Sequence, residues 1–483
     1  MLYWFLCVIV CFWLHWLWTR RKYYALMFKL PGRMGYPLLG IALDLTGTKK
    51  DPLEVMNDIN VKYGSVALTW LLHYPLFIVT DPDIIRDILM SPHCINKSKV
   101  YRPFKKAIGV GLLSSGNPEW SVHRKHLNPT FSHKILLSFI PVFNEEVNKL
   151  LEQFQQMDEC PDVISVLQEF TLTTGLRTTM GIEASERAIS ARLKANFNVL
   201  AKGLIQMVFS PWLAHDLIRK LYGIYEPFNT HRKDNEKIIQ NLIKKKLDKA
   251  NSGSKIFIDQ AVELLRKDIF SMQEVEDESN TMVVGALETT TNTIGYGLML
   301  LAMFPEYQER AYEELLAMFP EGGAFDVTYA NIQDMAYLDL IVNETMRLMA
   351  PGPLVARENT QDLQLSNGLV LPAGVQCVIN MFALHRRKDI WGPYADKFNP
   401  DHFLPSNIED KHPFAFIPFT KGVRSCIGRK YGLMSTKITL AKLLRNFKFS
   451  TDFKFEDLEY CDTLVLTLKR VPALKIEKRQ KIH

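Results

Sequence analysis

A single cysteine near the C-terminus lies in the most constrained stretch of this chain. The stretch reads Phe419-Thr-Lys-Gly-Val-Arg-Ser-Cys-Ile-Gly428 and leads directly into a helix-like segment. Its two glycines, Gly422 and Gly428, let the backbone turn tightly and approach a flat group closely. Backbone N–H donors, an aromatic cover and a helix N-terminus would keep Cys426 as a thiolate. The pattern therefore predicts a loop built around a metal-binding sulfur.

A buried structural cysteine in a turn is the alternative, because free cysteine usually behaves as a small buried hydrophobe. The fixed spacing of Phe419, Gly422, Arg424 and Gly428 around Cys426 favours the ligand instead. These ten residues match the haem-binding signature of the cytochrome P450 family, and the chain resembles that family over nearly its whole length. The resemblance implies that Cys426 is the axial thiolate of a b-type haem, whose electron donation favours O–O cleavage.

The N-terminus begins with an almost uninterrupted apolar run, residues 2–18, followed at once by Arg20, Arg21 and Lys22. Its length is at the short end for a bilayer-spanning helix. A cleaved signal peptide would carry positive charge before the run and small residues after it, and neither is present. A buried core segment is the other alternative, but three charges follow this run at an extreme terminus. We therefore expect an anchor with the rest of the chain on the cytoplasmic side.

A Pro/Gly-rich connector follows the anchor, with Pro31, Gly32, Gly35, Pro37 and Gly40. Such a stretch cannot continue a helix and should act as a stiff hinge. It is similar to the proline-rich hinge of microsomal members of the family. We expect residues 1–22 to form the membrane anchor, 23–40 a basic and Pro/Gly-rich hinge, and 41–483 one catalytic domain.

Composition is that of a folded protein facing a reducing compartment. Hydrophobic residues make up 47% of the chain and charged residues 23%, which is enough for a large core. The seven cysteines show neither CxxC pairs nor zinc spacing, so reduced thiols are expected. The net charge of +6 is spread along the chain, so nucleic-acid binding has no support. A basic patch facing an acidic partner or anionic lipid fits better.

A second motif, Gly285-Ala-Leu-Glu-Thr-Thr290, lies in a helix predicted over residues 275–303. Adjacent threonines are unusual in a buried helix, because their hydroxyls can bond back to preceding carbonyl oxygens and open a groove. A plain helix surface is the alternative. The segment resembles the family's oxygen-binding helix, which implies that Thr289 holds iron-bound oxygen by a hydrogen bond and Glu288 feeds protons to it.

Position 285 departs from a related branch of the family, the fatty-acid ω-hydroxylases. Many of those enzymes carry a glutamate there that can esterify the haem, whereas this chain has Gly285, followed by Ala286 in place of another glycine. Haem cannot be attached covalently through this position. The expectation of fatty-acid ω-hydroxylation is weakened accordingly.

A third pattern, Glu344-Thr-Met-Arg347, lies in an amphipathic stretch that Pro351 ends. Residues three apart share a helix face, and a surface ion pair is the ordinary interpretation. The family resemblance implies instead a buried structural pair that locks the cofactor loop. Relatives usually add an arginine from a later segment, where this chain has His402, so the three-way pairing is in doubt.

The two carboxylates of haem require cationic or indole N–H donors. Trp120 and Arg124 lie four residues apart and would share one helical face, while Arg357 and Arg424 come from distant segments. Each is individually more typical of a solvated surface. All four occupy positions similar to the family's haem-propionate ligands, and arginine matches carboxylate geometry well.

A glycine-containing segment, residues 109–116, superficially suggests a dinucleotide loop, but its third glycine is displaced and no clear strand precedes it. Electrons from NADPH should therefore arrive through a partner. The resemblance implies NADPH-cytochrome P450 reductase, with cytochrome b5 as a further possible partner. The expected docking footprint is basic and lies around Cys426, with Lys421, Arg429, Lys430 and Lys437.

The resemblance implies the family's mainly α prism with a minor β region. Short strands are expected near residues 66–80, 363–378 and 464–476, with residues 286–290 and Cys426 on opposite sides of the haem. Phrases such as Leu301-Ala-Met-Phe-Pro-Glu-Tyr-Gln308 are similar to an insect branch near the ω-hydroxylases. The expected location is the endoplasmic reticulum membrane, with a single pass.

The expected reaction inserts one atom of O2 into an apolar substrate, such as a lipid, hormone or xenobiotic. One alternative is a haem-thiolate isomerase or dehydratase that needs no reductase; such enzymes tend to lose the acid-alcohol pair that Glu288 and Thr289 retain here. The other alternative is a non-catalytic haem protein. The loops at residues 101–113 and 204–217 are apolar, which predicts an apolar ligand but does not identify it.

Overall fold

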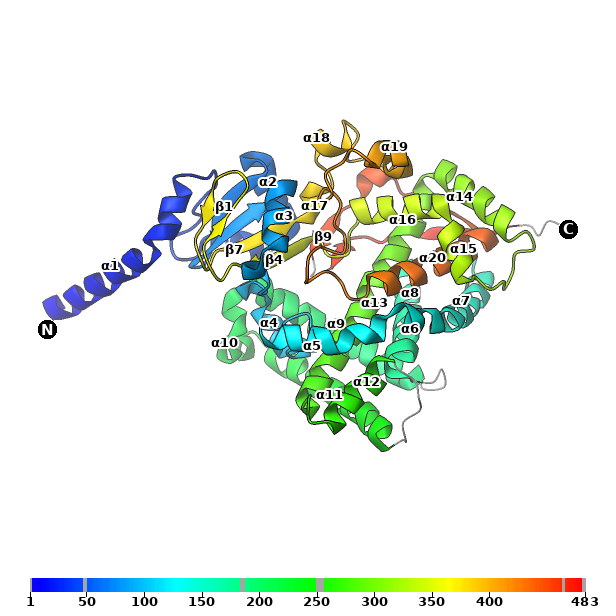
Figure 1. The fold of residues 1–483 in the computed structure, drawn as a ribbon, viewed down its shortest axis with the longest axis horizontal. Coiled ribbons are helices and arrows are strands. Elements are labelled where there is room, and N and C mark those ends of the chain that lie inside the picture. The colour runs from blue at the N-terminus through cyan, green and yellow to red at the C-terminus, as the bar shows by residue number, and fades with distance from the viewer. Residues whose placement is uncertain (1, 47–49, 183–186, 249–255, 463–464, 480–483) are drawn as a thin grey trace.

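The computed structural model describes residues 2–46, 50–182, 187–248, 256–462 and 465–479. Figure 1 shows a body built mainly of helices, with the sheet that contains β1, β4 and β7 on the side of the N-terminal helix, which projects away from the body. The predicted fold class, mainly α with a minor β part, is confirmed.

The α-helices of the described residues are connected mostly by short loops and 3-10 turns. Their bounds are α1 Leu2–Met27, α2 Pro52–Tyr63, α3 Pro82–Met90, α4 Arg102–Ile108, α5 Glu119–Leu127, α6 His133–Ser138, α7 Ile140–Gln155, α8 Val163–Gly175, α9 Arg187–Phe209, α10 Asp216–Leu221, α11 Tyr225–Asp248, α12 Phe257–Arg266, α13 Met272–Met303, α14 Pro305–Met318, α15 Tyr329–Asp334, α16 Ala336–Leu348, α17 Met381–Leu384, α18 Lys388–Trp391, α19 Pro405–Ile408 and α20 Arg429–Asn446.

The strands form four small sheets within the described residues. Their bounds are β1 Val66–Leu71, β2 Tyr74–Val79, β3 Glu159–Cys160, β4 Leu354–Glu358, β5 Leu363–Gln364, β6 Val370–Leu371, β7 Gln376–Asn380, β8 Phe447–Ser450, β9 Tyr460–Asp462, β10 Leu466–Leu468 and β11 Leu474–Lys478. The largest sheet has the order β1-β2-β7-β4, with only β2 and β7 parallel. The other sheets are β3-β11-β8, β10-β9 and β5-β6. The three strand regions predicted from the sequence all contain strands, although residues 463–464 lie outside the described part.

The N-terminal helix α1 is longer than the anchor predicted from the sequence. It is the one described helix that is long and apolar enough to cross a membrane. It continues to Met27, past the expected boundary at residue 22, because no helix breaker occurs before Pro31 and its last turns pack on the body. The Tyr24 ring stacks on Trp70 of β1 with centroids 5.1 Å apart, and the Tyr23 hydroxyl donates to the Ala373 carbonyl oxygen at 2.8 Å.

The long helix α13 is the central element of the body. Ser271 and Glu274 form a capping box at its start, which satisfies the backbone N–H groups of these two residues. The helix ends at Met303, just before Pro305, close to the limits predicted from the sequence.

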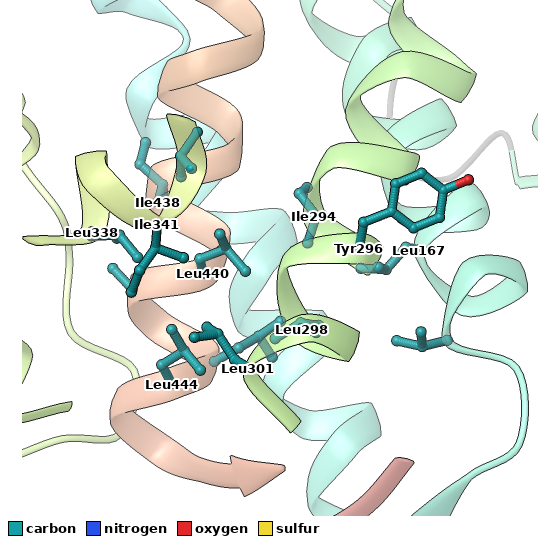
Figure 2. Close-up of a cluster of buried hydrophobic side chains, with 14 of the residues drawn as sticks. Leu167, Ile294, Tyr296, Leu298, Leu301, Leu338, Ile341, Ile438, Leu440 and Leu444 are labelled. Carbon is teal, nitrogen blue, oxygen red and sulfur yellow. The ribbon is translucent and has the colours of Figure 1, made fainter. Parts of the chain in front are cut away.

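The main hydrophobic core packs around the C-terminal half of α13. Figure 2 shows Ile294, Leu298 and Leu301 of this helix facing leucine and isoleucine side chains of α16 and α20, while Leu167 of α8 lies on another side. These side chains are almost fully buried, which removes a large apolar area from water. The core thereby fixes α13 against α20, the helix that begins just after Cys426.

Candidate functional site

The cysteine loop is a series of tight turns held by its own backbone. The Cys426 N–H donates to the Phe419 carbonyl oxygen at 3.0 Å. Gly422 has φ +77, and a Cβ there would lie 2.2 Å from the Leu89 carbonyl oxygen, so only glycine fits. Helix α20 starts at Arg429 with Gly428 as its N-cap, which places Cys426 near the positive end of a helix.

An interior cavity of about 320 Å³ lies between this loop and α13, lined mostly by apolar side chains. The lining includes eight of the residues singled out from the sequence: Cys426, Phe419, Arg424, Gly428, Thr289, Trp120, Arg124 and Arg357. Gly422, Glu288, Glu344 and Arg347 are not part of the lining. The fold thus brings together segments that are more than 300 residues apart in the chain.

Four basic side chains line this cavity, and none of the described lining residues is an aspartate or glutamate. They are Lys97, Arg124, Arg357 and Arg424. Arg357 is 1% exposed, and burial lowers its pKa. Buried cations without carboxylate partners are costly unless an anionic group completes the site. A flat cofactor with two carboxylates, such as haem, supplies that anion, so the residues present fit the group.

Arg424 is bound more closely to the protein than the sequence suggested. Its Nε donates to the Ile95 carbonyl oxygen at 2.9 Å, its Nη1 to that of Leu112 at 3.1 Å, and its Nη2 to that of Ser115. Its guanidinium also lies 4.4 Å from the centre of the Trp120 ring. Three of its five N–H groups are therefore used within the protein, and two are left for a cofactor carboxylate.

The surroundings of Cys426 act on its ionisation in both directions. The Cys426 side chain is exposed to the cavity. Desolvation by the surrounding protein raises the pKa of the thiol, while the Gly428 backbone N–H and the charges of Arg124, Arg429 and Lys97 oppose the shift. A bound metal would decide the balance, because a coordinating thiol is deprotonated outright. The site therefore suits a cysteine that is a metal ligand rather than a free nucleophile.

On the opposite wall, α13 presents the motif predicted to bind oxygen. The Thr289 hydroxyl donates to the Gly285 carbonyl oxygen at 2.7 Å, the back-bonding expected of threonine in a helix. Both residues line the cavity, and a Cβ added at Gly285 would meet nothing within 4 Å. Glu288 lies outside the cavity lining, and burial raises the pKa of its carboxyl.

Glu344 and Arg347 form a fully buried pair below the site. Arg347 donates through Nε at 2.6 Å and Nη2 at 2.7 Å to the two carboxylate oxygens of Glu344, and both side chains are 0% exposed. His402 Nδ1 lies 3.1 Å from Glu344 Oε1, so the third partner is present as histidine. Arg347 Nη1 also donates to the carbonyl oxygens of His385 and Ala395, which ties α16 to the segment leading to the cysteine loop.

Two results differ from the sequence-based expectations or were missed by them. Lys437 was expected on the docking surface, but it is 3% exposed and paired with Asp339 at 2.8 Å, because it faces the interior side of α20. Lys97 was not predicted at the site. Its pKa is lowered well below the ordinary lysine value by burial and by Arg357 and Arg424. No local motif distinguishes this lysine in the sequence.

A glycine-bounded cysteine loop, a helix with a threonine groove and a cluster of unpaired cations around one cavity define a haem-thiolate protein. The family model "Cytochrome P450" matches residues 30–474. This chain belongs to the cytochrome P450 family. It is a cytochrome P450 monooxygenase, and the family implies haem iron bound by a cysteine thiolate.

Curated proteins similar to this chain include several insect cytochromes P450. One, "Probable cytochrome P450 313a4" of Drosophila melanogaster, is 46% identical over 97% of both chains. Another, "Probable cytochrome P450 313a3" of the same organism, is 40% identical over 98% of both. "Cytochrome P450 4p1", also from Drosophila melanogaster, is 29% identical over 86% of this chain and 85% of its own. The similarity to an insect branch predicted from the sequence is confirmed.

Proposed function

We propose that this protein is a membrane-anchored monooxygenase that inserts one atom of O2 into an apolar small molecule, such as a lipid, hormone or xenobiotic. Its electrons come from NADPH through NADPH-cytochrome P450 reductase, with cytochrome b5 as an additional donor. The observation that carries the proposal is the shared cavity, which has Cys426 on one wall and the Thr289 groove on the other.

The proposal assigns a separate task to each group of site residues. When bound, haem supplies the oxidising chemistry, and it is held without a covalent link at position 285. Cys426 Sγ is the iron ligand, and Trp120, Arg124, Arg357 and Arg424 bind and orient the two haem carboxylates. Phe419 covers the sulfur, while Gly422 and Gly428 shape the loop around it.

Proton handling falls to the residues of α13. The Thr289 hydroxyl, already donating to Gly285, sits at the lip of the groove and can hold a proton next to the reacting oxygen. Glu288 does not line the cavity, so its contribution passes through intervening hydroxyl groups or water rather than by direct contact. Its raised pKa favours the protonated form that an acid requires. The apolar walls exclude bulk water from the reacting atoms.

We assign the division of the chain as follows. Residues 1–22 are the single-pass anchor in the endoplasmic reticulum membrane, residues 23–40 the hinge and residues 41–483 the catalytic domain on the cytoplasmic side. The apolar surface of α1 supports this assignment, since its described side chains from Tyr3 to Trp18 are largely exposed. Arg429 and Lys430 are exposed at the start of α20 and form the core of the reductase footprint.

The first test is spectroscopic. The purified protein, reduced and treated with carbon monoxide, should show the large red shift of the Soret band that thiolate coordination produces. The Cys426→His variant should bind haem without that shift. An unshifted band in the wild-type chain, or an unchanged shift in the variant, contradicts the proposed ligand.

The second test concerns the reaction. The protein reconstituted with reductase should consume NADPH and O2 and form a hydroxylated product from an apolar substrate in a broad panel. Peroxide rearrangement without NADPH would indicate a haem-thiolate isomerase or dehydratase instead. Haem binding with no turnover on any substrate would indicate a non-catalytic haem protein.

A further inference from the structure

A buried carboxylate of α13 contacts two other segments that build the site. Glu278 is 0% exposed. Its Oε1 lies 2.7 Å from His123 Nδ1 on α5, and its Oε2 accepts a hydrogen bond from the Leu112 N–H at 3.1 Å. Glu278 does not line the cavity, and neither the mechanism proposed above nor the sequence motifs assign it a role.

The first of these segments is α5, the helix that carries two of the residues proposed to bind the haem carboxylates. His123 lies on α5 between Trp120 and Arg124, both of which line the cavity. The His123 side chain is 4% exposed, and its second nitrogen, Nε2, lies 3.1 Å from Glu274 Oε1. Burial acts to lower the pKa of His123, but the hydrogen bonds and charges of Glu278 and Glu274 outweigh it and raise the pKa. The raised pKa favours a protonated His123, while burial also raises the pKa of Glu278.

The second segment is the loop before α5, which forms part of the cavity wall. Leu112 and Leu113 line the cavity, while the backbone just before them lies directly on α13. A Cβ at Gly109 would lie 2.0 Å from Asp277 Oδ1, and a Cβ at Gly111 would lie 2.2 Å from Thr281 Oγ1. The glycines that superficially suggested a dinucleotide loop therefore allow this close approach to the helix.

We propose that Glu278 is a positioning residue. Through His123 it holds α5, and through the Leu112 N–H it holds the cavity wall at residues 109–113, each at one fixed position along α13. This inference rests on the proposed function, since it assigns Trp120 and Arg124 to the haem carboxylates. Glu278 then acts both on the helix that carries Trp120 and Arg124 and on the wall against which an apolar ligand packs. The neighbouring Asp277 also accepts a hydrogen bond from the Val110 N–H of this wall, at 2.6 Å.

The energetic reason is the cost of losing one hydrogen bond between two buried ionisable groups. Without Glu278, the buried His123 ring keeps only Glu274, and without His123, the buried Glu278 keeps only the Leu112 N–H. Such a loss is more costly than the loss of an exposed contact. Arg424 holds the same loop from the side of the cysteine, through its bond to the Leu112 carbonyl oxygen. Leu112 is thus bound on its N–H by α13 and on its carbonyl by the cysteine loop.

The test compares Glu278→Gln with the matched control Glu276→Gln in the full-length haem-loaded protein. Glu276 is also a buried carboxylate of α13, but it faces Gln240 of α11. In Glu278→Gln, we expect haem transfer to an excess of a haem-scavenging globin to be about tenfold faster, since hydrogen bonds to charged groups contribute of this order. Amide hydrogen exchange in residues 109–113 should rise by a similar factor. Glu276→Gln should leave both rates at the wild-type level.

A spectral titration separates positioning from general stability. The affinity for imidazole measures access to the iron. The affinity for 4-phenylimidazole also depends on how well its phenyl group packs against the apolar wall. The extra affinity that the phenyl group confers should fall about fivefold in Glu278→Gln and stay unchanged in Glu276→Gln, because loosening the wall loses packed apolar area. His123→Asn provides the second variant if Glu278→Gln does not accumulate, with the same expected changes.

Wild-type rates and affinities in the Glu278 and His123 variants would overturn the inference, as would equal changes in Glu276→Gln. The outcome is separable from that of the proposed function. Hydrogen exchange in residues 109–113 reports whether Glu278 holds this wall on α13. It does so whether or not the wild-type protein gives a thiolate spectrum or any turnover.

Discussion

His402 Nδ1 lies 3.1 Å from Glu344 Oε1, the same oxygen that accepts a 2.7 Å hydrogen bond from Arg347 Nη2. The histidine thus takes the place where the family resemblance implies an arginine. The Asn399 N–H also donates to Glu344 Oε1 at 2.8 Å, so the carboxylate keeps three different partners. The shorter side chain reaches because the turn carrying it packs directly on α16.

This arrangement predicts unequal costs for removing the two partners. Glu344→Gln should destabilise the protein by about 3–5 kcal/mol, because it leaves the Arg347 charge buried and uncompensated. His402→Ala should cost about 1 kcal/mol, since Glu344 retains Arg347 and the Asn399 N–H. Urea unfolding of the haem-loaded variants measures both. A cost for His402→Ala equal to that of Glu344→Gln would show that the histidine, and not the arginine, dominates the pair.

Two glycines of α13 should respond in opposite ways to alanine. A Cβ at Gly285 meets nothing within 4 Å, so Gly285→Ala should stabilise the protein by about 0.5–1 kcal/mol through reduced chain entropy in the unfolded state. A Cβ at Gly295 would lie 2.4 Å from Ile164 Cδ1, so Gly295→Ala should destabilise it. Thermal unfolding of the two variants gives the comparison. Stabilisation by both substitutions would mean that the contact at Gly295 relaxes freely.

Thr289 should control how efficiently NADPH is used. In Thr289→Ala, we expect product formed per NADPH to fall by about tenfold or more, because the substitution removes the hydroxyl that we propose to hold a proton beside the reacting oxygen. NADPH consumption should continue, with hydrogen peroxide as the excess product. Thr290→Ala is the matched control, since Thr290 is the adjacent threonine lining the cavity. An equal loss in both variants would assign the effect to packing of α13.

His385 gives the protein a defined sensitivity to acid. Burial and then the charges of Arg347 and Arg386 lower its pKa from 6.5 to about 3, and its Nε2 accepts from the Ile417 N–H at 3.1 Å. Because the folded state keeps this group neutral, the unfolded state binds more protons below pH 6.5, and stability falls as the pH falls toward 3.

The corresponding measurement compares the wild-type chain with His385→Asn. The folding advantage of the wild-type chain over this variant should shrink by about 2 kcal/mol between pH 7.5 and pH 5. Urea unfolding at the two pH values measures the change. A constant difference across this range would show that His385 does not titrate between the folded and unfolded states.

Charge reversal at the start of α20 tests electron delivery. Arg429→Glu with Lys430→Glu should slow reductase-driven turnover by about tenfold or more, through weaker electrostatic attraction, while peroxide-driven turnover stays unchanged. Lys105→Glu with Lys237→Glu, at exposed positions on α4 and α11, is the matched control. Equal loss in both assays would remove the docking assignment. Lys437 is excluded from the test because it is buried against Asp339.

The sequence by itself was enough for the parts whose chemistry is local. The turn at Gly422, the helix after Cys426, the back-bonding threonine at 289 and the pairing of Glu344 with Arg347 depend on residues within one turn or one helix. The apolar run at the N-terminus likewise predicted a long helix. Such features follow from backbone sterics and periodicity, which act over a few residues.

The tertiary structure decided which distant side chains meet. Lys97 joins the arginines at the cavity, Glu288 lies outside the lining, and Glu278 reaches a histidine 155 positions away. These contacts depend on how α5, α13 and the cysteine loop pack, and side chains of the same type and local pattern can lie on either side of a helix. Burial sets their charge and their partners, and burial is a property of the whole fold.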